Sequence, residues 1–123
     1  SCRNREITYK IKIIHNGKEY RLRGFYDTGN NLYYNSKAVI VLDKKLFKKI
    51  FTIDEIYSAE YNKNYVECTF ADGKKSILPV IKIEKLLLYS DKKMNTILNV
   101  MAVCGSDFNN YDIILHNSFK TEV

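Results

Sequence analysis

The sequence predicts a mainly β domain whose strands close into a barrel, with one or two short helices. Two hairpin signals carry much of this prediction. Asn16-Gly17 and Asp72-Gly73 each lie between strand-like runs, and such pairs favour the tight turns that need positive φ at their central residues. The flanking runs are short and separated by turn residues, which is typical of a closed β domain.

The first half of the chain begins with two alternating strands. Residues 7–14 place apolar and polar side chains on opposite faces, and the return strand after Asn16-Gly17 leads to Asp27. Residues 38–42, AVIVL, form a short apolar run that predicts a buried strand. Asp43 then follows as an N-cap for a short helix, KKLFKKIF, whose lysines are interpreted as a solvated face.

The second half is predicted to contain fewer helical residues. Residues 52–64 are expected to form a loop with at most a fragment of helix. A second hairpin is predicted over 65–89, another strand over 94–104, and a last strand over 111–119 that ends in a helical turn. The total is about seven strands.

Composition limits the classes of protein that this chain can belong to. At 123 residues we expect one domain, residues 1–123, with enough core to fold without disulfides. The three cysteines are widely spaced and there are only two histidines, so neither a metal site nor a cofactor is expected. The net charge of +6 favours anionic partners, but Glu19, Glu67 and Glu84 interrupt any basic stripe, which argues against nucleic acid.

The triplet Asp27-Thr28-Gly29 is the main candidate for chemistry. It follows a strand whose residues alternate into the core, and a carboxylate that is turned inward must be paired, hydrogen-bonded or neutralised. A second carboxylate that shares a proton with the first is one solution. Because the chain has one such triplet, the second aspartate would come from a second copy in a two-fold symmetric dimer.

The stretch GFYDTGNNLYYNSKAVIVLDKKLFKKI resembles the peptidase domain of the sporulation sigma-E factor processing peptidases, which are membrane-anchored aspartic peptidases of endospore-forming bacteria. ILPVIKIEKLLLYSDKK and YDIILHNSF are similar in kind and order to later segments of that family, so that the resemblance covers about residues 7–119. It implies a retropepsin-type β domain, a homodimer and one catalytic Asp per subunit. It also implies removal of the N-terminal pro-segment from an inactive sigma factor, pro-sigma-E, at the cytoplasmic face of the cell membrane. The membrane-spanning half would precede this chain, and a signalling protein would activate the enzyme.

By position, the resemblance assigns Asp27 as the catalytic residue. Thr28 would hold the two active-site loops together across the dimer axis, and Gly29 would let the backbone pass close to substrate and partner. Asn30 and Asn31 would contact substrate backbone. The hairpin tip at residues 72–74 (Asp72, Gly73 and Lys74) would contribute to a substrate-covering flap.

Two segments depart from the family pattern and keep a second interpretation open. Residues 113–118, IILHNS, carry His116 where retroviral-type proteases usually have a small residue, and ADGKKS has fewer glycines than their flaps. The alternative is a peptidase-fold or small β-barrel module that binds a protein or nucleic acid without catalysis. Cleavage assays on Asp27 variants separate the two classes.

Overall fold

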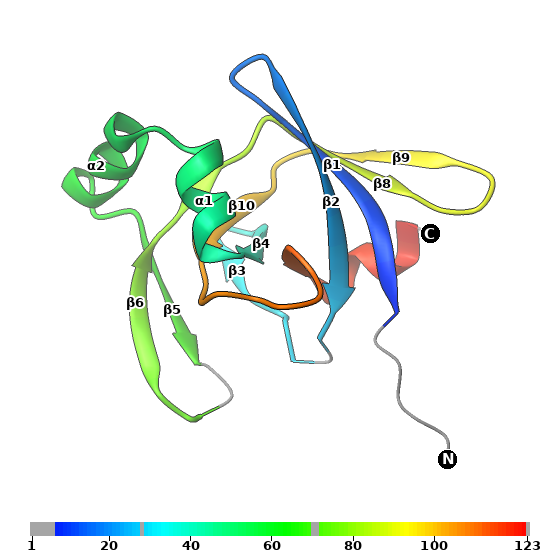
Figure 1. The fold of residues 1–123 in the computed structure, drawn as a ribbon. Helices are drawn as coiled ribbons and strands as arrows, with labels where there is room; N and C mark the ends of the chain where they lie inside the picture. The colour runs from blue at the N-terminus through cyan, green and yellow to red at the C-terminus, as the bar shows by residue number, and fades with distance from the viewer. Residues whose placement is uncertain (1–6, 28, 70–71, 123) are drawn as a thin grey trace.

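The computed structural model describes residues 7–27, 29–69 and 72–122, and it confirms the mainly β class (Figure 1). The described residues form eleven strands, two α-helices and one 3-10 helix, η1. The strands are β1 Thr8–His15, β2 Lys18–Tyr26, β3 Tyr33–Tyr34, β4 Lys37–Leu42, β5 Tyr65–Thr69, β6 Lys75–Pro79, β7 Ile81–Lys82, β8 Lys85–Tyr89, β9 Met94–Ile97, β10 Met101–Cys104 and β11 Ile113–Leu115. The helices are α1 Lys44–Ile50, α2 Ile53–Tyr61 and η1 Asn117–Glu122.

One large sheet forms the body of the molecule. Its strands run in the order β7-β10-β4-β11-β2-β1-β8-β9, with β3 paired to β4 beside this path, whereas β5 and β6 form a separate two-stranded sheet. The sheet curls into a half-barrel (Figure 1). Its edge strands β7 and β9 do not pair with each other within the described residues, so the sheet stays open. The closed barrel expected from the sequence is therefore not confirmed.

The β1–β2 hairpin forms as predicted. Asn16 and Gly17 have φ of 50° and 74°, and His15 pairs with Lys18, which gives the expected two-residue turn. The strand alternation buries Ile11 and Ile13, which are 2% and 0% exposed, and leaves the intervening residues on the outer face. This hairpin delivers the chain to Asp27.

The centre of the sheet is assembled from distant parts of the chain. β11 lies between β2 and β4, and it pairs parallel to β2 and antiparallel to β4. Gly24 permits this close packing, because a Cβ at residue 24 would lie 2.8 Å from Leu115 Cδ1 and 2.9 Å from Ile11 Cγ1. The segment after β11 is thereby placed beside the loop that follows β2.

The α1 helix confirms the predicted N-cap. Asp43 Oδ2 accepts hydrogen bonds from Lys45 N at 3.1 Å and Leu46 N at 3.2 Å. Asp43 Oδ1 accepts a third from Phe108 N at 2.8 Å, which ties the helix to the loop before β11. Phe47 and Ile50 are buried and pack the helix on the core.

The prediction of a loop over residues 52–64 is wrong, because Ile53–Tyr61 forms α2. Thr52 and Glu55 make a capping box, in which Thr52 Oγ1 accepts from Glu55 N at 3.1 Å and Glu55 Oε1 accepts from Thr52 N at 3.0 Å. Glu55 also contacts His15 Nε2 at 2.6 Å, so the helix is held against the end of β1. No helix in the described part of the chain has the length and apolarity needed to cross a membrane.

Two predicted long strands are broken in the structure. The return strand of the second hairpin is divided into β6, β7 and β8, and Pro79 ends the first of these. The strand expected over 94–104 is divided into β9 and β10, which lie at different places in the sheet. Asn99, with φ of 60°, turns the chain between them.

Candidate functional site

Asp27 lies in the turn that directly follows β2, and its side chain is exposed. Its Oδ1 accepts a hydrogen bond from Gly29 N at 3.2 Å, and its carbonyl oxygen accepts one from Asn30 N at 3.2 Å. These two hydrogen bonds hold the turn together, and the carboxylate stays exposed, so that a reactant can reach it. Thr28 lies outside the described residues, so its role across a dimer axis stays a prediction.

The space beside the Cα of Gly29 is open in the described structure. A Cβ at residue 29 would have Asp27 Oδ1, at 3.8 Å, as its nearest described neighbour, which is ordinary van der Waals separation. The predicted need for glycine would thus arise from a substrate or a partner subunit. That role remains a prediction.

Asn30 holds the loop to two strands of the sheet. Its side chain is buried, with 9% of the residue exposed, and its Nδ2 donates to Val39 O and to Leu115 O, both at 3.1 Å. Its Oδ1 accepts from Leu32 N at 3.3 Å. A buried amide with its donors and its acceptor satisfied supports the loop from below. The substrate contact predicted for Asn30 stays untested, and the geometry favours a supporting role.

Asn31 is exposed and connects the loop to the segment after β11. Asn31 Oδ1 accepts from Asn117 Nδ2 at 3.1 Å, and Asn117 N donates to Asn30 O at 3.0 Å. Residues 116–118 therefore lie directly behind the Asp27 turn. Because Asn31 is on the outside of this arrangement, its predicted contact with substrate is sterically open.

His116 fills the interior beneath the loop, at the position where the sequence departs from the family pattern. The residue is 1% exposed, and its ring packs edge-on against Tyr33, with ring centroids 4.5 Å apart. Its Nδ1 accepts from Ser118 N at 3.1 Å and lies 2.7 Å from Ser118 Oγ. Burial lowers the pKa of His116, and the backbone of Leu32 and Asn31 opposes this shift. The imidazole is a neutral, structural group near pH 7.

We predict that His116 makes the stability of the protein fall as the solution becomes acidic. A histidine whose pKa is lower in the folded state binds fewer protons there than in the unfolded chain, so stability is lost as the pH falls through its ordinary value of about 6.5. His116→Gln should therefore show a smaller decrease in melting temperature between pH 7.5 and 5.5 than the parent. Equal slopes for the two proteins would show that another group carries the acid sensitivity.

Tyr26, the residue before Asp27, is half-buried on the opposite side of the strand. Burial, followed by the charge of Tyr9, raises the pKa of Tyr26 to about 12, and the two rings meet edge-on with centroids 5.1 Å apart. Lys120 Nζ lies 5.4 Å from the centroid of the Tyr26 ring. The end of β2 is thus fixed by aromatic packing and by η1.

The β5–β6 hairpin forms the second sheet and extends away from the body of the molecule (Figure 1). Asp72, Gly73 and Lys74 are exposed near its tip, where Gly73 has φ of 81° and Asp72 Oδ1 accepts from Lys74 N at 2.9 Å. The predicted hairpin is therefore confirmed, but Thr69 pairs with Lys75, so its loop is longer than the tight two-residue turn expected from Asp72-Gly73. The assignment of residues 72–74 to a substrate-covering flap stays a prediction.

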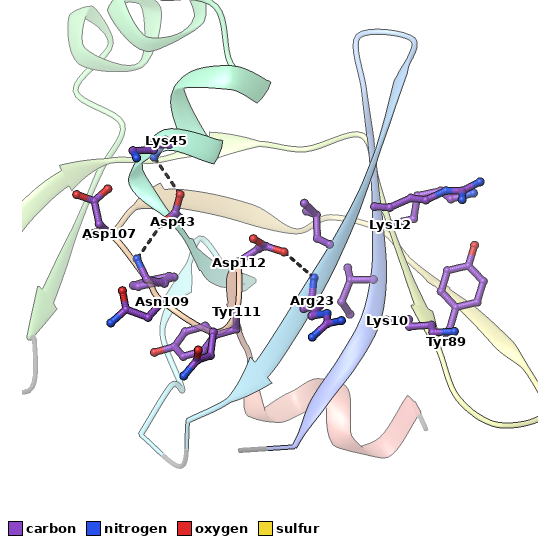
Figure 2. Close-up of a pocket in the computed structure, with 15 residues that line it drawn as sticks. Lys10, Lys12, Arg23, Asp43, Lys45, Tyr89, Asp107, Asn109, Tyr111 and Asp112 are labelled. Atoms are coloured by element: carbon purple, nitrogen blue, oxygen red, sulfur yellow. Dashed lines mark hydrogen bonds between the residues drawn. The ribbon is translucent and has the colours of Figure 1, made fainter. Parts of the chain in front are cut away.

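The described structure also has a groove whose lining residues do not include Asp27. It has a volume of about 1070 Å³ and lies between β1–β2 and the loop before β11 (Figure 2). The described residues contain no cluster of three or more His, Cys, Asp or Glu side chains that would bind a metal ion.

The comparisons place the chain in a class of peptidases. A family model named Peptidase U4 matches residues 1–119. Its description is sporulation factor SpoIIGA, and because the match covers nearly the whole chain, the chain belongs to this family. No curated protein and no solved structure gives a significant match. The resemblance seen in the sequence is thus confirmed at the level of the family.

Proposed function

We propose that the chain is an aspartic endopeptidase of the retropepsin type, which acts as a homodimer with one Asp27 from each subunit. The observation that carries the proposal is the exposed Asp27 carboxylate on a turn that is anchored to the sheet through Asn30 and residues 116–118. An anchored turn holds a carboxylate in a defined direction, as catalysis by a positioned acid or base requires.

The chemistry proposed for the reaction supports the homodimer. In the dimer, the two carboxylates would share one proton, because like charges at hydrogen-bonding distance do not both ionise. The ionised member removes a proton from a water molecule, whose oxygen attacks the scissile carbonyl carbon. The protonated member donates a hydrogen bond to the carbonyl oxygen, and the leaving amine takes up a proton when the C–N bond breaks.

The family supports the choice of substrate. Membership of the sporulation factor SpoIIGA family supports a protein substrate in sporulation, which we propose is the N-terminal pro-segment of an inactive sigma factor, pro-sigma-E. We place the domain at the cytoplasmic face of the cell membrane, held by a membrane-spanning segment N-terminal to it, with a signalling protein as activator. Such an anchor would raise the local concentration of subunits and favour the dimer.

The test is to impose dimerisation on the chain. The chain is fused to a parallel two-stranded coiled coil, incubated with the pro-form of its sigma factor, and the substrate mass is followed by mass spectrometry. A fusion to a monomeric helix of the same length is the control. We expect cleavage by the coiled-coil fusion and little by the control at the same concentration. Absence of cleavage by a fusion that is shown to be dimeric would refute the proposal for the domain alone.

A further inference from the structure

The outer face of the β1–β2 hairpin carries four cationic side chains that we call the cationic face: Lys10, Lys12, Arg21 and Arg23. The register places Lys10 directly opposite Arg23 and Lys12 directly opposite Arg21. Like charges directly opposite each other on one face of a sheet are destabilising. Two such pairs in succession should lower the stability of the hairpin, so their presence needs an explanation other than stability.

Few acidic groups neutralise this face. Of the four cations, only Lys12 forms a salt bridge within the described ranges, with Glu19 at 3.4 Å. Arg21, Arg23 and Lys10 are exposed on the strand surface. The face therefore presents positive charge to solvent and favours an anionic partner.

The cationic face is one wall of the groove described above. The opposite wall contains Asp43, Asp107 and Asp112 (Figure 2). Asp43 accepts three backbone hydrogen bonds, and Asp112 Oδ2 accepts one from Arg23 N at 2.8 Å, so both have structural partners. Figure 2 shows Asp43 and Asp107 near α1 and shows Lys10 and Lys12 on the far side of the Asp112–Arg23 contact. Lys45 also lines the groove beside Asp43, so the acidic charge at that end is partly balanced, whereas the four cations gather at the other end.

The cationic face is continuous with Asp27 along one strand. Successive side chains of a strand point to opposite faces, so Arg21, Arg23 and Phe25 share the outer face of β2, and Asp27 occupies the next position of the same alternation. Phe25 stacks on Tyr111, with centroids 4.9 Å apart and an interplanar angle of 29°. An aromatic surface therefore lies between the cations and the candidate catalytic residue.

We propose that the cationic face is an exosite that binds an extended acidic segment of the protein substrate, an inference that rests on the function proposed above. The two cationic pairs are two residues apart along the strands, or about 7 Å, which matches the spacing of alternate side chains in an extended peptide. Arg23 lies four residues before Asp27, or about 13 Å along the strand. The substrate would therefore carry acidic side chains at alternate positions, about four and six residues from the cleaved bond.

The groove fits a peptide better than other anions. Asp43 and Asp107 at its other end would repel a continuous phosphate backbone, and a concave surface does not match a flat lipid leaflet. Asn109 and Asn110, on the same wall, offer amide groups that pair with a peptide backbone. Arginine at two of the four positions suits bidentate binding of carboxylates.

The test measures binding without turnover, using the Asp27→Asn chain. The probe is a fluorescein-labelled Thr-Glu repeat peptide of twelve residues, followed by fluorescence anisotropy, with the corresponding Thr-Gln peptide as a neutral probe. The variant is Arg21→Gln with Arg23→Gln. The matched control is Lys48→Gln with Lys49→Gln, which removes the same charge from the exposed surface of α1 outside the groove.

We expect the Thr-Glu peptide to bind more tightly than the Thr-Gln peptide. The arginine variant should weaken its binding roughly tenfold, and the lysine control less than twofold, because two charge-assisted contacts are lost in the first case only. Equal weakening by both variants, or equal binding of both peptides, would overturn the exosite. Tighter arginine-dependent binding of oligo(dT) or of phosphatidylglycerol vesicles would also overturn it and would assign the face to a different partner. Because no cleavage is measured, failure of the proposed catalysis leaves this result unaffected.

Discussion

Replacing Asp27 by Asn is expected to abolish cleavage of the pro-sigma factor by the dimerised chain while the fold stays intact. An amide does not remove a proton from water, and loss of a positioned acid or base typically costs about 10²–10⁴-fold in rate. The Asn oxygen can still accept the hydrogen bond that Gly29 N donates to Oδ1 of Asp27, so the turn keeps its shape. The measurement is the substrate mass over time, together with the melting temperature of each protein.

The control for this experiment is Asp91→Asn. Asp91 is an exposed aspartate in the turn between β8 and β9, so its replacement makes the same chemical change far along the chain from Asp27. We expect parental activity from this control. Cleavage by the Asp27→Asn dimer at the parental rate would remove Asp27 from the mechanism and would favour the interpretation of the fold as a binding module.

Replacing Asn30 by Ala is expected to give the largest loss of stability among single changes in the loop. The change removes both hydrogen bonds to Val39 O and Leu115 O in a buried environment and leaves these carbonyls without the donor. A buried group left unsatisfied costs about 1–3 kcal/mol, so two give a total of roughly 2–6 kcal/mol. For a domain of this size, the melting temperature should fall by about 10 °C.

Asn31→Ala is the matched control for Asn30. Asn31 is the same residue type at the next position, but it is exposed. Its side chain accepts a hydrogen bond from Asn117 Nδ2 on the surface. We expect its replacement to change the free energy of unfolding by less than about 1 kcal/mol. If the two variants have the same melting temperature, then Asn30 does not anchor the loop. If Asn31→Ala keeps its stability but loses substrate affinity, the predicted substrate contact is supported.

Local signals in the sequence predicted the local parts of the fold. The Asn16-Gly17 turn, the Asp43 cap and the β5–β6 hairpin all depend on residues close to one another in the chain, and the structure contains each of them. The α2 helix had such a signal as well, since Thr52 and Glu55 have the spacing of a capping box. The helix has no clear apolar face that repeats every 3.6 residues, because Ala59 is its one buried residue among those described.

Long-range contacts explain what the sequence did not reveal about the site. Asn30 was assigned to substrate because it stands just beyond the triplet, where the resemblance implies contact with substrate backbone. In the structure its Nδ2 donates to Leu115 O, 85 positions further along the chain. The environment of His116 likewise depends on Tyr33, which belongs to a distant strand. No pattern within one segment encodes such a pairing. The position of Asp27 itself was accessible to prediction because the turn follows directly from the alternation of β2.

The central position of β11 has a consequence for protein synthesis. β11 is inserted between β2 and β4, and its parallel pairing with β2 joins residues about 90 positions apart, such as Gly24 and Ile113. Until Leu115 has left the ribosome, a nascent chain has neither the strand that completes the sheet nor one of the two carbonyl groups that anchor Asn30. Non-local pairings of this kind also form slowly. A half-made chain would therefore have an unformed Asp27 turn, so that, if the turn has the catalytic role proposed above, translation itself delays the onset of proteolysis.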